Sequence, residues 1–427
     1  MIPIFFNKGN HIYLPDYNCL INNEVKDVFL KNSEKAKVEH SDIDGRIVKS
    51  RCKDLRQLVF EITQDCNLNC QYCIFSGIYY FKRKRSKKSL NIDIVRKALK
   101  YVFNILKDRN EKEFIIGFYG GEPLLRFDII RTIVELSRII FSGWRLRYSL
   151  STNLTLLNRQ MIDFFIDNKF AIQVSLDGPP ENHDEKRIFH NGKGTFSCIM
   201  NKLDTIKKIN DSYYRDNIQF EAVYSKDLSL KKVYDFFITN ELVKTNDIIL
   251  SFVNEYNTNY YLRFPYDKSR LLDEYRIIFN TIYGKMDKKM YLYPIESELI
   301  SFFSALLNDL TIKRFSCLFG SCLFDIRLFL DAKGYFHICE KINHNFPIGN
   351  VWNGLNFEKM SQIANSFISL MNNKCKKCEV KYLCHRCYPI FAKDGIFGSN
   401  DEFCENSRQS IITNLEDLIK LKEERLI

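Results

Sequence analysis

The sequence lacks any apolar run that approaches the 18 or more residues of a membrane-spanning helix. Its first residues, MIPIFF, lack the basic region that opens a secretory signal peptide, and the polar residues 7–10 follow them. Internal repeats and low-complexity tracts are also missing. We therefore expect a cytoplasmic protein that has no membrane partner and whose thiols stay reduced.

The composition is that of a globular chain, since 45% of the 427 residues are hydrophobic and 27% are charged. This length is comfortable for two or three domains. The formal net charge of +11 is compatible with an acidic peptide partner and does not require nucleic acid. A basic run from Lys82 to Lys88, KRKRSKK, is expected to be a solvated loop rather than a binding patch.

Cysteine is abundant and unevenly distributed. Of 14 cysteines, three lie within residues 66–73 and eight lie between residues 317 and 404. In a reducing compartment, clustered cysteines are more often metal ligands than disulfides. The remaining three stand alone and are expected to be ordinary small buried residues: Cys19, Cys52 and Cys198.

Residues 58–256 alternate between short β-type runs and helical periodicity, which predicts a parallel α/β sheet. Asn91 and Thr195 are suitable N-caps for two of the helices. We expect strands at residues 58–63, 114–119, 147–152, 171–177, 218–224 and 248–254, and helices at residues 92–106, 128–141, 161–168, 195–210 and 230–240.

Polar or glycine-containing groups follow the first four predicted strands. They are the three cysteines of residues 66–73, then Gly120-Gly121-Glu122, then Ser151-Thr152-Asn153, then Ser175-Leu176-Asp177-Gly178. Parallel α/β sheets place their chemistry at the carboxyl ends of the strands. The sequence therefore predicts an active site at one rim of the sheet.

The flanking segments carry weaker patterns. Residues 4–6 and 11–14 predict a β-hairpin, and residues 24–31 predict a helix. Residues 269–310 are expected to be mainly helical, and residues 415–424 to form a charged helical tail.

The three cysteines Cys66, Cys70 and Cys73 have the spacing C-x3-C-x2-C on a predicted loop. Three thiolates can bind three irons of a [4Fe–4S] cubane and leave the fourth iron open. S-adenosylmethionine has the amino and carboxylate groups that can chelate an open iron, and its reductive cleavage gives a 5′-deoxyadenosyl radical that abstracts hydrogen. The alternative is zinc, but structural zinc needs four ligands, and no histidine lies within ten residues of this loop.

These motifs resemble those of radical S-adenosylmethionine (SAM) enzymes with a SPASM extension. The C-x3-C-x-aromatic-C motif includes Tyr72, and residues 120–123 match the glycine-rich motif. The resemblance implies an α/β fold, a partial (β/α)6 radical SAM barrel. It also implies that the glycines approach the SAM amino group, that Glu122 accepts from that group, and that Arg187 pairs with a ligand carboxylate or with Asp177. The implied cofactor-binding residues are Tyr72, Gly120, Gly121, Glu122, Ser151, Asn153, Asp177 and Arg187.

The same resemblance divides the chain into five segments. We expect an N-terminal segment that can form part of a peptide-recognition element, a radical SAM core, a helical linker, a cysteine-rich SPASM domain and a C-terminal helix. Their predicted bounds are residues 1–55, 56–260, 261–315, 316–410 and 411–427.

The second cysteine region has the SPASM-like pattern C-x11-G-x4-C followed by C-x2-C-x5-C-x2-C, with two residues in the last gap where many members have three. The resemblance implies two auxiliary [4Fe–4S] clusters, whereas two four-thiolate zinc sites are the alternative. If cysteines ligate every iron of both auxiliary clusters, the clusters are expected to relay an electron away from the oxidised substrate. If one iron of the first cluster were open, that iron would bind a substrate thiolate directly. The implied ligands are Cys317, Cys322, Cys339 and Cys387 for the first cluster, and Cys375, Cys378, Cys384 and Cys404 for the second.

Glu340 directly follows Cys339. In sulfatase-maturating enzymes the matching position is an acid thought to act as a base, so Glu340 is a candidate catalytic residue. The alternative is an exposed acid in a loop.

The resemblance implies an oxidoreductase that acts on a peptide or protein. We expect a maturase that cross-links or otherwise oxidises a ribosomally made precursor peptide, because about 55 residues precede the radical SAM core and can help bind a leader strand. The alternatives are an anaerobic sulfatase maturase that makes formylglycine and a non-enzymatic zinc scaffold. The expected partners are the peptide and a flavodoxin- or ferredoxin-like electron donor, with no nucleic acid, and the expected state is a monomer.

Overall fold

The computed structural model divides the chain into two compact units, one of residues 45–298 and 324–360 and one of residues 1–44, 299–323 and 361–427. Each is described by itself. The predicted bounds of the five segments stay a prediction. The structure describes residues 6–8, 11–14, 19–22, 43–288, 290–304, 326–341, 344–381, 384, 387–409 and 411–412.

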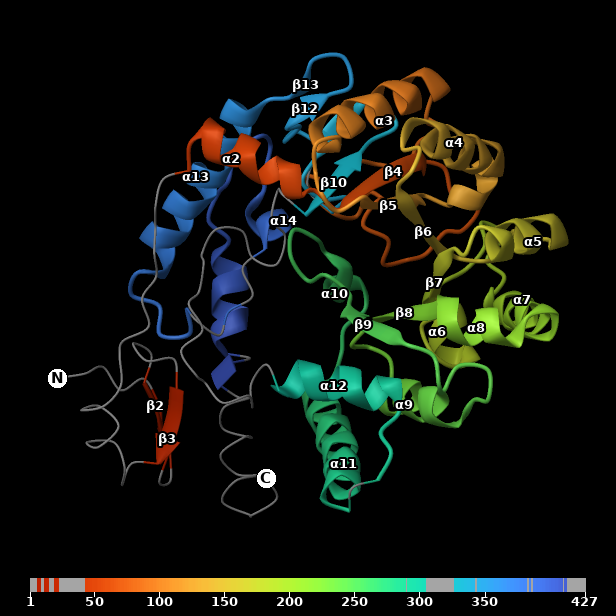
Figure 1. The fold of residues 1–427 in the computed structure, drawn as a ribbon. Helices are drawn as coiled ribbons and strands as arrows, with labels where there is room; N and C mark the ends of the chain where they lie inside the picture. Colours follow the sequence, from red (N-terminus) through yellow and green to blue (C-terminus); the bar gives the residue numbers. More distant parts are fainter. Residues whose placement is uncertain are drawn as a thin grey trace. The chain divides into compact units, whose positions relative to one another are not determined.

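Six parallel strands in sequential order form the centre of the first unit, as the alternating pattern predicts. In Figure 1 they follow one another along an arc, with helices outside them. Their bounds differ from the prediction by no more than two residues at either end. They are β4 (Gln57–Thr63), β5 (Glu113–Gly120), β6 (Arg145–Thr152), β7 (Ala171–Ser175), β8 (Ile218–Tyr224) and β9 (Ile248–Phe252).

A seventh parallel strand, β10 (Arg327–Leu330), lies beside β4 and pairs Leu328 with Leu58. The short strands β11 (Tyr335–His337), β12 (Gly349–Asn350) and β13 (Gly354–Leu355) then extend the sheet antiparallel. The strand order runs linearly from β13 to β9. The sheet is therefore open, in agreement with a partial barrel.

The helices after the strands bury one apolar stripe each against the sheet. In α3 (Ile92–Leu106) the buried residues include Val95, Leu99 and Val102, and the Asn91 side chain caps the helix by accepting from the Asp93 amide at 2.7 Å, as predicted. Phe114 of β5 stacks on Phe141 with ring centroids 5.4 Å apart. The other crossover helices are α4 (Phe127–Ile140), α5 (Arg159–Asp167), α6 (Pro180–Lys186), α7 (Phe196–Ile209), α8 (Asp211–Asn217) and α9 (Leu230–Thr239).

Thr195 occupies the N-cap position of α7, as predicted, but its side chain makes no capping hydrogen bond. Its hydroxyl donates instead to the Arg187 carbonyl at 2.9 Å. The Asp184 carboxylate accepts from the amides of Thr195 and Phe196 at 2.7 and 2.8 Å. A charged acceptor therefore fills the role that the sequence pattern gave to a hydroxyl.

The remaining helices of this unit are short or follow β9 in the sequence. The helical character predicted for residues 269–310 is confirmed as far as residue 304, where the described stretch ends. The helices are α2 (Gly45–Arg51), α10 (Tyr260–Arg263), α11 (Lys268–Asp287) and α12 (Pro294–Ser304), with one-turn 3₁₀ segments at Cys52–Asp54 and Pro123–Arg126. The last six residues of α12 belong to the second unit.

In the second unit, the N-terminal hairpin is present, but its first strand includes residues 7 and 8, which were expected between the strands. It also has a third strand that the sequence did not indicate. Strands β1 (Phe6–Lys8), β2 (His11–Leu14) and β3 (Cys19–Asn22) form an antiparallel sheet. Helices α13 (Phe357–Cys375) and α14 (Tyr388–Phe391) follow later. The helices predicted at residues 24–31 and 415–424 lie outside the described residues. In the part that is described, no helix is both long and apolar enough to cross a membrane.

Candidate active site

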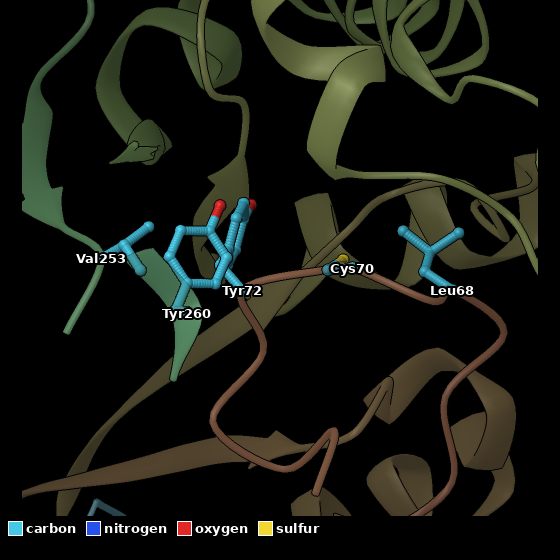
Figure 2. Packing of buried hydrophobic residues seen from close by; sticks show 5 residues of the cluster. All are labelled: Leu68, Cys70, Tyr72, Val253 and Tyr260. Atoms are coloured by element: carbon cyan, nitrogen blue, oxygen red, sulfur yellow. The ribbon is translucent and has the colours of Figure 1, made fainter. Parts of the chain in front are cut away.

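The loop that carries Cys66, Cys70 and Cys73 directly follows β4, as predicted. Cys70 is buried and the other two cysteines are half-buried. Figure 2 shows Tyr72 beside Tyr260, with Cys70 and Leu68 on the same loop. Leu68, Cys70 and Tyr72 belong to a buried cluster with Val253 and Tyr260, so core packing fixes the loop.

The thiols of Cys66 and Cys70 are poor acids in the protein alone. Burial raises the pKa of Cys66 to about 12 and that of Cys70 to about 11. A nearby cation such as iron favours the thiolates that ligation requires. Three thiols on one partly accessible loop therefore match a metal cluster better than an inert packing role.

Gly120 and Gly121 are needed where the end of β5 meets the chain just before Cys66. A Cβ on Gly121 would lie 1.9 Å from the Asp65 carbonyl oxygen, and one on Gly120 would lie 2.3 Å from that of Thr63. The Gly121 amide donates to the Thr63 carbonyl at 2.7 Å. The two glycines thus allow a close backbone approach that positions the cysteine loop. Their predicted contact with the SAM amino group stays a prediction.

Glu122 is buried, and both of its carboxylate oxygens accept hydrogen bonds from the protein. Oε1 accepts from the Thr152 hydroxyl at 2.7 Å and from the Leu124 amide at 3.0 Å, and Oε2 accepts from the Asn153 amide at 2.8 Å. Burial raises the pKa of Glu122. The residue therefore ties the glycine motif to the end of β6, a role that sequence reasoning missed.

Asn153 reaches the cysteine loop, whereas Ser151 faces along the sheet. The side-chain nitrogen Nδ2 of Asn153 donates to Asn67 Oδ1 at 3.0 Å and lies 4.0 Å from the Cys66 sulfur. The Ser151 hydroxyl donates to Gln173 Oε1 at 2.9 Å. The structure thus brings Asn153 to the cluster loop, and a ligand role for either residue stays a prediction.

Tyr72, Asp177 and Arg187 form one buried group, and Asp177 is the partner that Arg187 takes. Arg187 donates through Nε and NH2 to the two Asp177 oxygens, both at 3.1 Å, and its NH1 lies 3.9 Å from the Cys70 sulfur. The Tyr72 hydroxyl donates to Asp177 Oδ2. Burial opposes ionisation of Asp177, but the Arg187 guanidinium outweighs it and holds the pKa of Asp177 below its usual value. This bidentate pair connects the end of β7 to the cysteine loop.

The basic run of residues 82–88 is not simply solvated, which corrects the expectation from its composition. Lys84, Lys87 and Lys88 are exposed, but Arg83 and Arg85 are half-buried. Arg83 pairs with the buried Glu61, and Arg85 NH1 donates to the Leu68 carbonyl at 2.5 Å. The two arginines of the run therefore contact the protein, whereas the lysines at 84, 87 and 88 face the solvent.

Glu340 is buried rather than an exposed acid in a loop. Its Oε2 lies 3.2 Å from Arg327 NH2 and 3.6 Å from the Cys339 sulfur. A carboxylate with a cation and a thiol beside it can hold or release a proton. Its role as a base stays a prediction.

Four of the later cysteines line one cavity of about 260 Å³ within the second unit. They are the four that the resemblance assigns to the second auxiliary cluster: Cys375, Cys378, Cys384 and Cys404. Of the first set, Cys317 and Cys322 lie outside the described residues, and Cys339 and Cys387 belong to different units. The donor set suits either a cubane or zinc. Of the lone cysteines, Cys52 is buried, Cys198 is half-buried, and the side chain of Cys19 is not described.

A histidine pair near Cys339 offers a further possible ligand group. His337 Nε2 lies 3.0 Å and His344 Nδ1 lies 3.4 Å from Asp331 Oδ2. Asp331 Oδ1 also accepts from the amides of Lys333 and Tyr335. Donation of one N–H by each ring to Asp331 explains these contacts without a metal ion.

Comparison with protein families identifies the region around this loop. Residues 60–215 match the model of the radical SAM superfamily. These residues contain the three cysteines, the glycine motif and the Asp177–Arg187 pair. The chain contains a radical SAM domain.

Beyond the radical SAM domain, similarity extends over most of the chain. A cysteine-type anaerobic sulfatase-maturating enzyme of Clostridium novyi is 25% identical over 86% of this chain and 96% of its own length. The radical SAM cyclopropyl synthase TigE of Paramaledivibacter caminithermalis is 24% identical over 48% of this chain and 40% of its own length. The SPASM-like cysteines lie in the part of the chain that follows the radical SAM domain.

Solved structures share the fold. The structure titled native anSMEcpe with bound AdoMet has a TM-score of 0.64 at 22% identity and covers 86% of this chain and 99% of its own. The same enzyme with bound AdoMet and Cp18Cys peptide has a TM-score of 0.61, also at 22% identity, and covers 87% and 99%. The radical SAM domain therefore has the mixed α/β fold of these structures, with an open sheet.

A radical SAM domain implies one [4Fe–4S] cluster and SAM, and the residues present fit both. Cys66, Cys70 and Cys73 supply three thiols, one fewer than a closed cubane needs. The loop stands at the carboxyl ends of the parallel strands β4 to β6, where such folds bind ligands.

Proposed function

We propose that the protein is a radical SAM maturase that oxidises a side chain of a peptide or protein substrate. The observation that carries this proposal is the three-cysteine loop of the radical SAM domain, held by Asn153 and the Asp177–Arg187 pair. When bound, the cluster and SAM supply a carbon-centred radical that abstracts hydrogen from the substrate.

The chain's own residues hold and orient this site. Glu122 fixes the glycine motif against the end of β6, and Asp177 neutralises Arg187 while both brace Tyr72. Glu340, buried between Arg327 and Cys339, is suited to take a proton from the substrate. Glu340 lies in the same compact unit as the cysteine loop.

Two substrates agree with these features. A ribosomally made peptide, cross-linked or otherwise oxidised, is favoured by the three-stranded N-terminal sheet, since an edge strand of a sheet can pair with an extended leader peptide. A sulfatase is favoured by similarity over 96% of the length of a cysteine-type sulfatase-maturating enzyme. We place the peptide cross-link first and formylglycine formation second.

Two auxiliary clusters are part of the same proposal. The cavity lined by Cys375, Cys378, Cys384 and Cys404 supports the second of them. Held by these cysteines, fully ligated clusters would supply an electron relay away from the oxidised substrate. A flavodoxin- or ferredoxin-like protein is the proposed low-potential electron donor. We further propose a cytoplasmic monomer.

The test is anaerobic incubation of the reconstituted protein with SAM, a reductant and two classes of substrate. One class is the set of short peptides encoded beside the gene, and the other is a sulfatase peptide with cysteine or serine at the modified position. Mass spectrometry that finds loss of two hydrogens with sulfur retained supports cross-linking, whereas an aldehyde captured by a hydrazide supports formylglycine. SAM cleavage with neither product on any peptide would refute the proposed substrate class.

A further inference from the structure

The segment that follows the cysteine loop packs back onto it. The Lys88 carbonyl accepts from the Gln64 amide at 2.8 Å, and the Ser86 hydroxyl donates to Gln64 Oε1 at 2.8 Å. The Arg85 amide donates to the Phe75 carbonyl at 3.1 Å. Residues 83–89 therefore run alongside the end of β4 and the cysteine loop, and we call them the arginine segment.

Arg83 anchors this segment. Its guanidinium pairs with Glu61 and lies 3.7 Å from the centre of the Phe75 ring. Glu61 is fully buried, and its other oxygen accepts from Gln64 Nε2 at 2.8 Å and from the Ala332 amide at 3.0 Å. The charge of Arg83 is thus compensated by a carboxylate that is itself held firmly.

The guanidinium of Arg85 lies beside the cysteine loop, and its charge is not compensated by a carboxylate in the way that Glu61 compensates Arg83. Arg85 NH1 donates to the carbonyl of Leu68, between Cys66 and Cys70. Its side chain also donates a hydrogen bond to the side chain of Cys73. Within the described part of the chain, Arg85 makes no ion pair with a carboxylate, whereas Arg187, the other guanidinium at the loop, is neutralised by Asp177.

We propose that Arg85 is a positioning residue that tunes the cluster of the radical SAM domain. Its uncompensated charge stabilises the extra negative charge that the cluster acquires when an external low-potential reductant donates one electron, and so raises the reduction potential. This inference rests on the proposed function only in requiring that a cluster binds Cys66, Cys70 and Cys73, and it does not depend on the substrate.

The expected size follows from Coulomb's law. A unit charge within about 10 Å of the cluster, at an effective dielectric constant of about 20, changes the one-electron reduction equilibrium by about tenfold or more. Tenfold corresponds to ~59 mV for one electron. Removal of the charge should therefore shift the midpoint to a more negative potential by at least about this amount.

The experiment is a reductive titration of the anaerobically reconstituted full-length protein, followed by electron paramagnetic resonance. The signal that changes on addition of SAM identifies the cluster of the radical SAM domain. The variants are Arg85→Gln and Arg85→Met, which remove the charge, and Arg85→Lys, which keeps it. The controls are Lys84→Gln and Lys87→Gln, which remove one charge each from exposed positions of the same run.

A more negative midpoint in Arg85→Gln and Arg85→Met, with Arg85→Lys and both controls close to the wild type, is the expected result. Unchanged midpoints in the neutral variants overturn the inference, as do equal shifts in the controls. Loss of the SAM-sensitive signal from both neutral variants also overturns it, because Arg85 would then hold the loop rather than tune the cluster. Absence of that signal from the wild type would instead refute the proposed function.

Discussion

The stability of the protein should fall as the pH is lowered through the range in which a free histidine titrates, because His183 is held neutral. Its Nδ1 accepts from the Asp177 amide at 3.1 Å, so Nε2 carries the proton and donates to the Thr195 hydroxyl at 2.8 Å. That hydroxyl in turn donates to the Arg187 carbonyl. Protonation of Nδ1 would place two N–H groups against each other at the base of the Asp177–Arg187 pair.

The sign and size of this effect follow from linkage. Burial lowers the pKa of His183 from 6.5 to about 4. Below pH 6.5 the unfolded chain binds a proton that the folded chain does not, so this stability is complete above pH 6.5 and is lost progressively down to pH 4. The shift corresponds to a loss of about 3 kcal/mol in the free energy of unfolding.

The assay is denaturant unfolding at several pH values for the wild type and His183→Gln, with the two proteins at equal iron content. The variant cannot titrate at this position, so the difference in unfolding free energy between the two proteins should shrink from neutral pH to pH 4 by about 3 kcal/mol. An equal dependence on pH in both proteins would refute the assignment of a buried neutral His183.

Three further predictions concern the site and its surroundings. Gly121→Ala should lower the amount of iron bound after reconstitution, because the added Cβ would lie 1.9 Å from a carbonyl oxygen. The control Gly284→Ala has open space around the added Cβ and should bind as much iron as the wild type, as measured by iron analysis. Arg187→Met should cost about 3–5 kcal/mol in denaturant unfolding because it leaves Asp177 buried without its partner, and adding Asp177→Asn should restore part of the loss; a single variant as stable as the wild type would contradict this. Cys404→Ala should remove about four irons per chain while cleavage of SAM continues, and unchanged iron would argue against an auxiliary cluster at that cavity.

Local patterning predicted the parallel core well. The apolar periodicity of residues 92–106 and the polar cap Asn91 gave the helix bounds that the structure shows. The strand ends were also accurate enough to gather the cysteine loop, Asn153 and Asp177 at one rim. These features depend on side chains close together in the sequence, which period and capping chemistry describe directly.

Features that depend on distant pairing were missed. β10 pairs with β4 although Leu328 and Leu58 are 270 positions apart, and residues 327–330 carry too short a pattern to indicate it. Two residues of the basic run are half-buried because Arg83 forms an ion pair with Glu61 and Arg85 donates a hydrogen bond to the Leu68 carbonyl. Composition alone reports the charge of such a run and says nothing of its partners.

The most direct test of the central claim is the formation of 5′-deoxyadenosine by the anaerobically reconstituted protein with SAM and a strong reductant. The account predicts that the wild type forms it and that the variant with Cys66, Cys70 and Cys73 all replaced by Ala does not, although it keeps the irons of the later cysteines. Continued formation of 5′-deoxyadenosine by that variant would contradict the assignment of these three cysteines to the SAM-binding cluster.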